Sequence, residues 1–515
     1  MNRFTDSGRI VRYGGDAIAV MAGAASVLAF SPFDVSPLAI ICPALLFALW
    51  SVSSARRAAW RGFLYGAAEF LLGIYWIYIA VSGLGPAPWW LGVLLYVLLA
   101  LACAVFPALL GYVTVRLAPR PGGWWLVLVP AGWALLEWVR SFVFTGFPWL
   151  ALGYSQAPNP LGGYGPVFGV YGVSFACVAL AVLIVLTLRP ARPAWSRAAG
   201  IAGIGAVFLL GFVLGHVHWT QARGAAFPVA LVQGDIPQQK KWLDDGTKLS
   251  LDRYTALTRK HYDAVPLVIW PEAAIPNWYS LVAPRLIRFG AEAQARGAAI
   301  VYGVLAYDWK NDDSYNAVAA MGAGVGLRNT VYYKRHLVPF GEYFPVPGWL
   351  KNLLAQHALP HSSFTPGPLD QPPLAVGPWR IAVANCYEIA FGRLLRRQLP
   401  TANFIINVSD DGWFGHSIAL AQQFQMGQMA ARETGRYVLA DTNSGVTGII
   451  GPDGRVQARL PEHRIGVLTA KIQARVGTTP YVRVGNWLIA SLCTVLLILG
   501  SGVLFYRRRK QRVRH

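Results

Sequence analysis

The sequence predicts a polytopic α-helical membrane domain that carries an α/β domain outside the bilayer. Long uncharged apolar runs fill the first 220 residues and recur near the C-terminus. Of the 515 residues, 55% are hydrophobic and only 13% are charged, against about 25% charged in soluble proteins. The stretch between the runs has ordinary polar content, and its short β-rich segments alternate with helix-like segments. That alternation is typical of a sheet covered by helices on both faces.

The apolar runs define the membrane domain, because about 18 or more apolar residues suffice to cross a bilayer. We predict eight spans, at residues 15–31, 36–54, 62–82, 88–115, 124–140, 162–188, 198–218 and 485–506. Three regions follow: a seven-helix membrane domain at 1–220, the α/β domain at 221–480, and the eighth span with a basic tail at 481–515.

Arginine placement orients these spans. Arginine clusters precede the first span, separate the second from the third, the fourth from the fifth and the sixth from the seventh, and fill the tail. The positive-inside rule places those segments and both termini in the cytoplasm, and residues 219–484 on the opposite side. The same placement accounts for the net charge of +21 without a nucleic-acid partner.

The five cysteines fall into two groups. Cys42, Cys103, Cys177 and Cys493 lie in apolar runs, where a cysteine is usually a small buried hydrophobe. Only Cys386 lies in the α/β region, so it has no partner there for a disulfide or a cysteine-based metal site. No histidine spacing of a metal site and no phosphate-binding glycine loop is apparent, so we expect neither a metal nor a cofactor.

Two acidic residues and one loop of the membrane domain have no obvious role. Glu69 lies in the third predicted span and Glu137 near the end of the fifth. Intramembrane acids are often functional, but we favour structural pairing, either with a neighbouring helix or between Glu137 and Arg140. The uncharged aromatic loop 145–156 fits an interfacial aromatic belt and the lining of a lipid entry equally well.

Reactive side chains follow three apolar segments of the α/β region. Glu272 ends the segment that begins at Leu267, Lys334 follows another, and Cys386 ends the segment that begins at Ile381. Sites in α/β folds form at the carboxyl ends of strands. A thiol needs a base, which a carboxylate with a burial-raised pKa can provide, and an ammonium can stabilise the thiolate and an oxyanion. Singly, these residues are more often a turn carboxylate, a surface lysine and a packing cysteine.

Together, the three segments resemble the nitrilase superfamily, whose members use a Glu–Lys–Cys triad on an αββα sandwich. The matching motifs are Trp270-Pro-Glu272, Tyr333-Lys334-Arg335 and Asn385-Cys386-Tyr387-Glu388, with support from Asn407–Gly415 and Arg432–Arg436. The whole chain resembles the membrane branch of that superfamily, the apolipoprotein N-acyltransferase family. In that family a nitrilase-like domain lies between the seventh and eighth of eight membrane helices.

The resemblance implies a two-step acyl transfer without a cofactor. Glu272 would take the proton of Cys386, and the thiolate would attack an ester of a membrane phospholipid, which we expect to be phosphatidylethanolamine. Lys334 and the backbone N–H of Tyr387 would stabilise the oxyanion. The acyl group would then pass from a thioester to the N-terminal amine of a diacylglyceryl-cysteine apolipoprotein, the last step of bacterial lipoprotein maturation. This implies a multi-pass protein of the bacterial inner membrane, with its α/β domain in the periplasm, and we expect a monomer.

Other candidate residues have two interpretations each. Glu342 and Glu388 would orient or polarise the site, or would form salt bridges to Lys334 or Arg335. Tyr387 is a candidate substrate-binding residue. Trp242 would sit on a lid near lipid, or would pack as a core or interfacial side chain.

Two rival functions fit parts of the sequence. A membrane-anchored amidase or nitrile hydrolase would use the same triad, but a single span is enough for an anchor. A transporter or scaffold with an inactive nitrilase fold would not need Glu272, Lys334 and Cys386 all intact.

Overall fold

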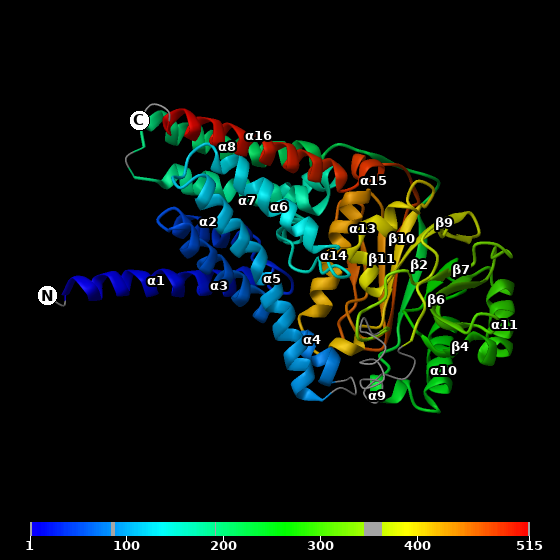
Figure 1. The fold of residues 1–515 in the computed structure, drawn as a ribbon. Helices are drawn as coiled ribbons and strands as arrows, with labels where there is room; N and C mark the ends of the chain where they lie inside the picture. The colour runs from blue at the N-terminus through cyan, green and yellow to red at the C-terminus, as the bar shows by residue number, and fades with distance from the viewer. Residues whose placement is uncertain (1–2, 84–87, 191, 344–362, 513–515) are drawn as a thin grey trace. The chain divides into compact units, whose positions relative to one another are not determined.

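The computed structural model describes residues 3–83, 88–190, 192–343 and 363–512 (Figure 1). The chain divides into two compact units, which we call the helical unit and the α/β unit. The helical unit comprises Met1–Tyr75, Val93–Val217 and Val484–His515. The α/β unit comprises Trp76–Gly92 and His218–Arg483. Residues 513–515, at the end of the predicted basic tail, lie outside the described residues.

Each of the eight predicted spans contains a helix. The helices are α1 (Arg3–Ser26), α2 (Leu38–Trp50), α3 (Ala55–Gly73), α5 (Trp89–Leu117), α6 (Trp125–Arg140), α7 (Gly165–Leu188), α8 (Ala194–Gly215) and α16 (Trp487–Arg512). Short η helices lie between them: η1 (Val27–Ala29), η3 (Leu152–Gln156) and η4 (Pro160–Tyr164). Ser54 begins α3 as a cap, because its side-chain oxygen accepts a hydrogen bond from the Arg57 N–H.

Fewer helices are long enough to span a membrane than the eight that we predict. Within the described ranges, Trp89–Leu117, Pro160–Leu188 and Ala194–Gly215 are sufficiently long and apolar. A fourth span results if α3 and the segment Trp76–Gly83, bent by 46° relative to each other, count as one. Tyr13–Ala29, Leu38–Trp50 and Trp487–Val503 are apolar but shorter. The chain is therefore a membrane protein with several apolar helices.

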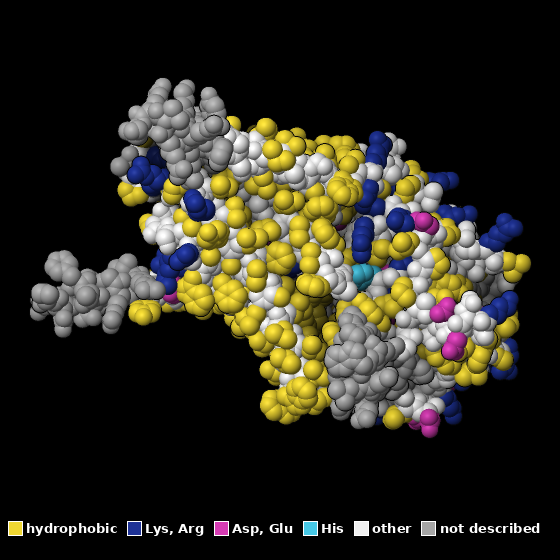
Figure 2. All heavy atoms as spheres, in the orientation of Figure 1, with side chains coloured by type: hydrophobic (Ala, Val, Ile, Leu, Met, Phe, Trp, Pro, Cys, Tyr) yellow, Lys and Arg dark blue, Asp and Glu magenta, His cyan; other side chains and the backbone are white. Residues whose placement is uncertain are grey.

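The surface of the helical unit is strongly apolar. Along α8, only 6% of the most apolar window is buried inside the protein, and Phe208, Leu209 and Phe212 are exposed. Figure 2 shows hydrophobic side chains over much of the visible helical surface. An uncharged helix surface of this kind fits lipid, which solvates apolar side chains but not charges.

Two sheets form the centre of the α/β unit. In the seven-stranded sheet, the order is β14-β2-β3-β5-β6-β7, with β4 paired to β5. Its strands are β2 (Phe227–Gln233), β3 (Leu267–Ile269), β4 (Ile275–Trp278), β5 (Ala299–Asp308), β6 (Asp313–Gly322), β7 (Val331–Tyr333) and β14 (Gly466–Ile472).

The six-stranded sheet has the order β13-β12-β11-β10-β9-β8. Its strands are β8 (Leu374–Val376), β9 (Trp379–Asn385), β10 (Phe404–Ser409), β11 (Val438–Thr442), β12 (Gly448–Ile450) and β13 (Val456–Arg459). A separate antiparallel pair joins β1 (Thr220–Ala222) to β15 (Arg475–Gly477).

The two sheets pack face to face between layers of helices (Figure 1). Alternate apolar residues such as Leu231, Ile269 and Ile406 fill the space between the sheets. The opposite face of the seven-stranded sheet packs against α10 (Gly246–Arg259) and α11 (Tyr279–Ala295), around Trp270 and Phe289. Helices α13 (Gly392–Arg396) and α14 (Ala419–Thr434) cover the six-stranded sheet. This confirms the predicted α/β domain with both faces covered.

One segment of the predicted third span belongs to the α/β unit. The helix expected over 62–82 ends at Gly73, and α4 (Trp76–Tyr78) and η2 (Ile79–Gly83) group with the α/β unit. The Trp76 ring packs edge-on against Phe414, with ring centroids 5.0 Å apart. Phe414 ends η7 (Asp411–Phe414), directly after the β10 strand end. The α/β unit is thus assembled from two separate pieces of the chain.

Candidate active site

Cys386 lies at the carboxyl end of β9, where the backbone turns sharply. It begins η6 (Cys386–Ala390), is buried, and has φ +57°. A left-handed backbone costs a residue with a side chain on the order of 1–2 kcal/mol, so the surrounding contacts must hold it. Because β9 and β10 are parallel, with Asn385 opposite Val408, the ends of both strands lie together at one edge of the sheet.

Beside this edge, one ammonium lies between two carboxylates. The Nζ of Lys334 donates to Glu272 Oε1 at 2.9 Å and to Glu342 Oε1 at 3.0 Å. Asn316 Nδ2 donates to the same two oxygens, at 2.7 and 2.8 Å. The other oxygen of Glu272 accepts a hydrogen bond from the Asp410 N–H at 2.9 Å. Charge-assisted bonds of this kind are strong and fix geometry.

The two carboxyl groups that share the ammonium have pKa values shifted in opposite directions. Burial opposes ionisation of Glu272, but the Lys334 charge and the hydrogen bonds from Lys334, Asp410 and Asn316 outweigh it and lower its pKa. Burial raises the pKa of Glu342, and the Glu272 charge adds to that effect. Burial alone would lower the pKa of Lys334, but the two carboxylates raise it well above its usual value. At neutral pH, Glu272 is therefore ionised and Lys334 is charged.

The Cys386 thiol has the opposite tendency. Burial, together with the Glu272 charge, raises the pKa of Cys386 well above its usual value, although Lys334 partly offsets this. The resting site therefore holds a neutral thiol near an ionised carboxylate, which is the arrangement that a base and its nucleophile require. Our expectation of a burial-raised pKa on the base is wrong for Glu272, because Lys334 dominates there.

A second set of polar groups contacts the sulfur. The Ser409 Oγ lies 3.2 Å from the Cys386 Sγ and also bonds to the Asp411 carboxyl. Gln423 Nε2 donates to the Ser409 Oγ at 2.9 Å and lies 4.0 Å from the sulfur. Ser409, Asp411 and Gln423 are all buried.

Glu388 joins the Cys386 and Lys334 segments rather than pairing with a cation. One of its oxygens accepts from the N–H groups of Arg335 at 2.7 Å and His336 at 3.0 Å. The other accepts from the Asn385 N–H at 2.9 Å and the Tyr332 hydroxyl at 2.7 Å. The salt bridge to Arg335, one of the two interpretations of Glu388, is thus replaced by a hydrogen bond from the Arg335 backbone N–H. The ion-pair interpretation holds for Glu342, which contacts Lys334.

The remaining two predicted residues flank the strand ends. The Tyr387 ring packs at right angles to Phe391, with centroids 4.8 Å apart. Trp242 follows α9 (Gln238–Lys241), where its indole N–H donates to Gln238 Oε1 at 2.9 Å. Its ring lies 6.4 Å from that of Trp413, in η7.

A buried ion pair fixes α9 beside the site. The Lys241 Nζ lies 2.7 Å from an oxygen of Asp410, and both side chains are almost completely buried. Asp410 also donates its N–H to Glu272. The Trp242 segment is therefore tied to the carboxylate through Asp410.

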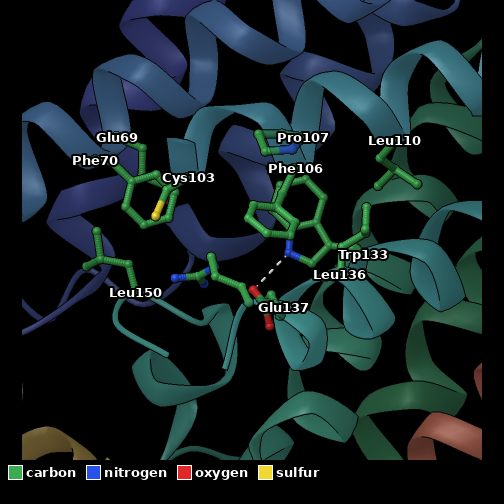
Figure 3. A pocket seen from close by; sticks show the side chains of 11 residues that line it. Glu69, Phe70, Cys103, Phe106, Pro107, Leu110, Trp133, Leu136, Glu137 and Leu150 are labelled. Carbon is green, nitrogen blue, oxygen red and sulfur yellow. Dashed lines mark hydrogen bonds between the residues drawn. The ribbon is translucent and has the colours of Figure 1, made fainter. Parts of the chain in front are cut away.

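The acids Glu69 and Glu137 line a small pocket of about 30 Å³ in the helical unit (Figure 3). Ser26 Oγ donates to Glu69 at 3.0 Å. The Trp133 N–H and the Leu152 N–H donate to Glu137, at 2.9 and 3.0 Å. Such a volume holds about one water-sized group rather than an acyl chain.

Most of the aromatic loop 145–156 is buried within the helical unit. The guanidinium of Arg140 donates to the Phe147 and Trp149 carbonyls, at 2.8 and 2.5 Å. Trp149 and Tyr154 are buried, whereas Phe144, just before this loop, is almost completely exposed. Burial of this loop does not fit an aromatic belt. The bonds of Glu137 to the Trp133 and Leu152 N–H groups support a structural role for this acid, but they differ from the suggested pair with Arg140, which donates to carbonyls instead.

The sequence alone did not single out Asn316 or Gln423, and it included Ser409 and Asp411 only as members of the Asn407–Gly415 stretch. Asn316 lies within strand β6, and Gln423 lies within helix α14. Ser409 is the last residue of the apolar strand β10 and Asp411 lies two residues further on, and this position at a strand end was an available signal. No group of three or more His, Cys, Asp or Glu in the described ranges is placed to hold a metal ion.

The fold and the Glu–Lys–Cys arrangement define the α/β unit as a carbon-nitrogen hydrolase-type domain, and that family's model matches residues 228–481. A model of the apolipoprotein N-acyltransferase N-terminal domain matches residues 22–183. The chain belongs to the apolipoprotein N-acyltransferase family, which confirms the resemblance drawn from its motifs.

Full-length relatives carry this conclusion. The chain is 39% identical to an apolipoprotein N-acyltransferase of Nitrosomonas europaea, over 95% of this chain and 97% of the relative. It is 37% identical to one of Coxiella burnetii, over 94% and 99%. It is also similar to the solved structure of Saccharomyces cerevisiae Nit3, a nitrilase-superfamily member, at 16% identity and a TM-score of 0.37 over 49% of this chain and 93% of that one.

Proposed function

We propose that the chain acylates the N-terminus of apolipoproteins in two half-reactions that share Cys386 as the acyl carrier. The observation that carries this proposal is the ionised Glu272, held by Lys334, near a neutral buried thiol. Full-length relatives named for the same activity support it. The rival amidase interpretation predicts the same triad but a different acceptor, water.

In the first half-reaction, Glu272 takes the thiol proton as the sulfur attacks the ester carbon of a phospholipid. The ester oxygen becomes an oxyanion, which the Lys334 ammonium and the backbone N–H of Tyr387 stabilise. When the intermediate collapses, the C–O bond breaks and the leaving alkoxide receives the proton from Glu272. The products are a lysophospholipid and a thioester on Cys386.

In the second half-reaction, the amine of an apolipoprotein is the nucleophile, whereas an amidase would use water at this step. Glu272, ionised again, takes a proton from the attacking amine, and the C–S bond breaks to release the N-acylated product. The same proton then returns to the sulfur, which restores the neutral thiol. Every group begins and ends in the same state, and no cofactor takes part.

The membrane placement is part of the proposal. We infer eight spans, with residues 221–480 inserted between the seventh and the eighth, in the bacterial inner membrane. The arginine-rich connections favour both termini in the cytoplasm and the α/β unit in the periplasm. The apolar helices of 1–220 and 481–515 would keep the enzyme in the bilayer that holds both lipid substrates. We propose a monomer with phosphatidylethanolamine as donor.

Substrate contacts are assigned to two of the flanking residues. Tyr387 adjoins the nucleophile, and Trp242 lies near Trp413 in the segment that follows β10. Both have large apolar faces suited to an acyl chain or a lipidated cysteine. Glu342 and Glu388 act by positioning Lys334 and the two strand ends.

Intact-mass measurement after incubation with phosphatidylethanolamine in detergent tests this proposal. We expect one acyl adduct on the purified chain, which hydroxylamine removes and which a diacylglyceryl lipopeptide receives. The Cys386→Ser variant should show no hydroxylamine-labile adduct. Absence of the adduct on active protein would refute the carrier role. Faster release of free acid from small amides than acylation of the lipopeptide would favour the amidase.

A further inference from the structure

The Ser409 hydroxyl has two competing acceptors, and this competition has a chemical consequence. Its oxygen lies 3.2 Å from the Cys386 sulfur on one side and bonds to an Asp411 oxygen on the other. Gln423 Nε2 donates to the same oxygen, at 2.9 Å. A serine hydroxyl has one proton and two lone pairs, so it can donate to only one of the two neighbours at a time.

We propose that Ser409 is a further catalytic residue and that Asp411 is a positioning residue, whose protonation sets whether the Ser409 hydroxyl donates to the Cys386 sulfur. When Asp411 is protonated, its O–H and the Gln423 amide occupy both lone pairs of Ser409. The serine proton then points to the sulfur and stabilises a thiolate. When Asp411 is ionised, its carboxylate accepts the hydrogen bond of the Ser409 hydroxyl, and the thiol S–H becomes a donor to the Ser409 oxygen.

Ser409 and Gln423 contact the sulfur in addition to the charges of Glu272 and Lys334. Thiolate character is needed twice, when the sulfur attacks the ester and when it leaves the amine adduct. The thiol proton still goes to Glu272 and returns from it. The Asp411 proton stays in place during turnover, so the pair changes the acidity of the thiol without consuming or releasing a proton.

The surroundings of Asp411 place its titration near neutrality. Burial raises the pKa of Asp411 to about 7, although the Ser409 hydroxyl lowers it, and Glu272, Asp410 and Glu462 add further negative charge. Lys241 pairs with the neighbouring Asp410.

Close packing also holds the Asp411 carboxyl in place. A methyl group added at Gly445 would lie only 2.3 Å from its Oδ2. The carboxyl therefore has little room to move away from Ser409 when it ionises.

The inference rests on the proposed role of Cys386 as nucleophile. To keep the two separable, its test measures the reactivity of the thiol and does not require acyl transfer. We would measure the rate at which iodoacetamide alkylates Cys386 in the full chain, by peptide mass, between pH 6 and 9. Asp411→Asn imitates the protonated acid, because its side-chain amide carries no charge and can donate to Ser409 at every pH of the series. We expect this variant to react about 10-fold faster than the original chain at pH 8, the effect of one hydrogen bond to a charged group.

The double variant separates the relay from simple charge removal. In a Ser409→Ala background, Asp411→Asn should gain less than about 3-fold, because the hydroxyl that transmits the change is gone. An equal gain in both backgrounds would show that Asp411 acts only through its charge, and would overturn the relay. An unchanged rate and pH profile in Asp411→Asn would also overturn it.

Asp441→Asn is the matched control. Asp441 is also a buried aspartate, in the neighbouring strand β11, and its replacement should leave the alkylation profile of Cys386 unchanged. If Asp411→Asn speeds alkylation of Cys386 only when Ser409 is present, but wild-type protein never forms an acyl adduct, the proposed function fails while the relay stands. If acyl transfer occurs but wild type and Asp411→Asn share one pH profile, the relay fails while the proposed function stands.

Discussion

Replacing Glu388 should weaken the fold of the site before it affects the chemistry. Its carboxylate accepts hydrogen bonds from three backbone N–H groups and the Tyr332 hydroxyl, all in the interior. In Glu388→Gln, the remaining oxygen can serve Arg335 and His336, and the new amide can donate to Tyr332. The Asn385 N–H then faces another donor and is left unsatisfied.

The number of lost acceptors sets the size of the effect. One buried donor without a partner costs about 1–3 kcal/mol, so Glu388→Gln should fold with a lower melting temperature. Glu388→Ala leaves three backbone donors without an acceptor, roughly 3–9 kcal/mol. That is comparable with the whole net stability of an ordinary domain, about 5–15 kcal/mol. We expect the alanine variant to accumulate poorly as folded protein.

Thermal unfolding in detergent, followed by tryptophan fluorescence, and acyl-adduct formation by intact mass should be measured on the same samples. Glu388→Gln should unfold earlier but still form the adduct. The control Glu292→Gln, at a half-exposed ion pair with Arg259, should change stability by about 1 kcal/mol or less. A Glu388→Gln variant with unchanged melting temperature and no adduct would refute the positioning role, because the carboxylate would then act in the reaction itself.

Three further changes have outcomes that the structure fixes. Lys241→Met leaves the Asp410 charge buried without its partner, so unfolding should cost roughly 3–5 kcal/mol less; the double change with Asp410→Asn should recover part of the loss, measured by melting temperature. Burial raises the pKa of Asp441 well above its usual value, so the folded state retains a proton and the free energy of unfolding falls as pH rises above about 4. Asp441→Asn should therefore raise the melting temperature more at pH 8.5 than at pH 5. Equal changes in melting temperature at the two pH values would contradict this. A methyl group at Gly23 would lie 2.0 Å from the Tyr65 carbonyl oxygen, so Gly23→Val should separate α1 from α3 and lower the melting temperature in detergent, whereas the control Gly14→Val meets nothing within 4 Å.

Local sequence patterns predicted the elements that repeat a simple periodicity. The apolar segments that begin at Val229, Leu267, Ile381 and Phe404 all form strands, because each buries its side chains on both faces. Parallel order then places the ends of β9 and β10 together, which explains why the cysteine at the end of β9 was informative.

Contacts between distant segments were beyond such patterns. Asn316 lies in the middle of β6, and nothing in its neighbours indicates that it donates to two carboxylates. The pKa direction of Glu272 depends on Lys334, which is 62 residues away in the chain. The bend after Gly73 was also missed, because α3 and α4 form one continuous apolar run in sequence.

The division of the α/β unit between Trp76–Gly92 and His218–Arg483 affects how the unit must be made. The shorter piece leaves the ribosome well before the strands it joins, so it has to wait until synthesis of both sheets is complete. A fragment that begins at His218 would also lack residues 76–92 of the α/β unit. In such a fragment the Phe414 ring loses the Trp76 ring that packs against it. Phe414 ends η7, the short helix that follows β10. Fragments intended for crystallisation or screening should therefore supply residues 76–92, fused or in trans.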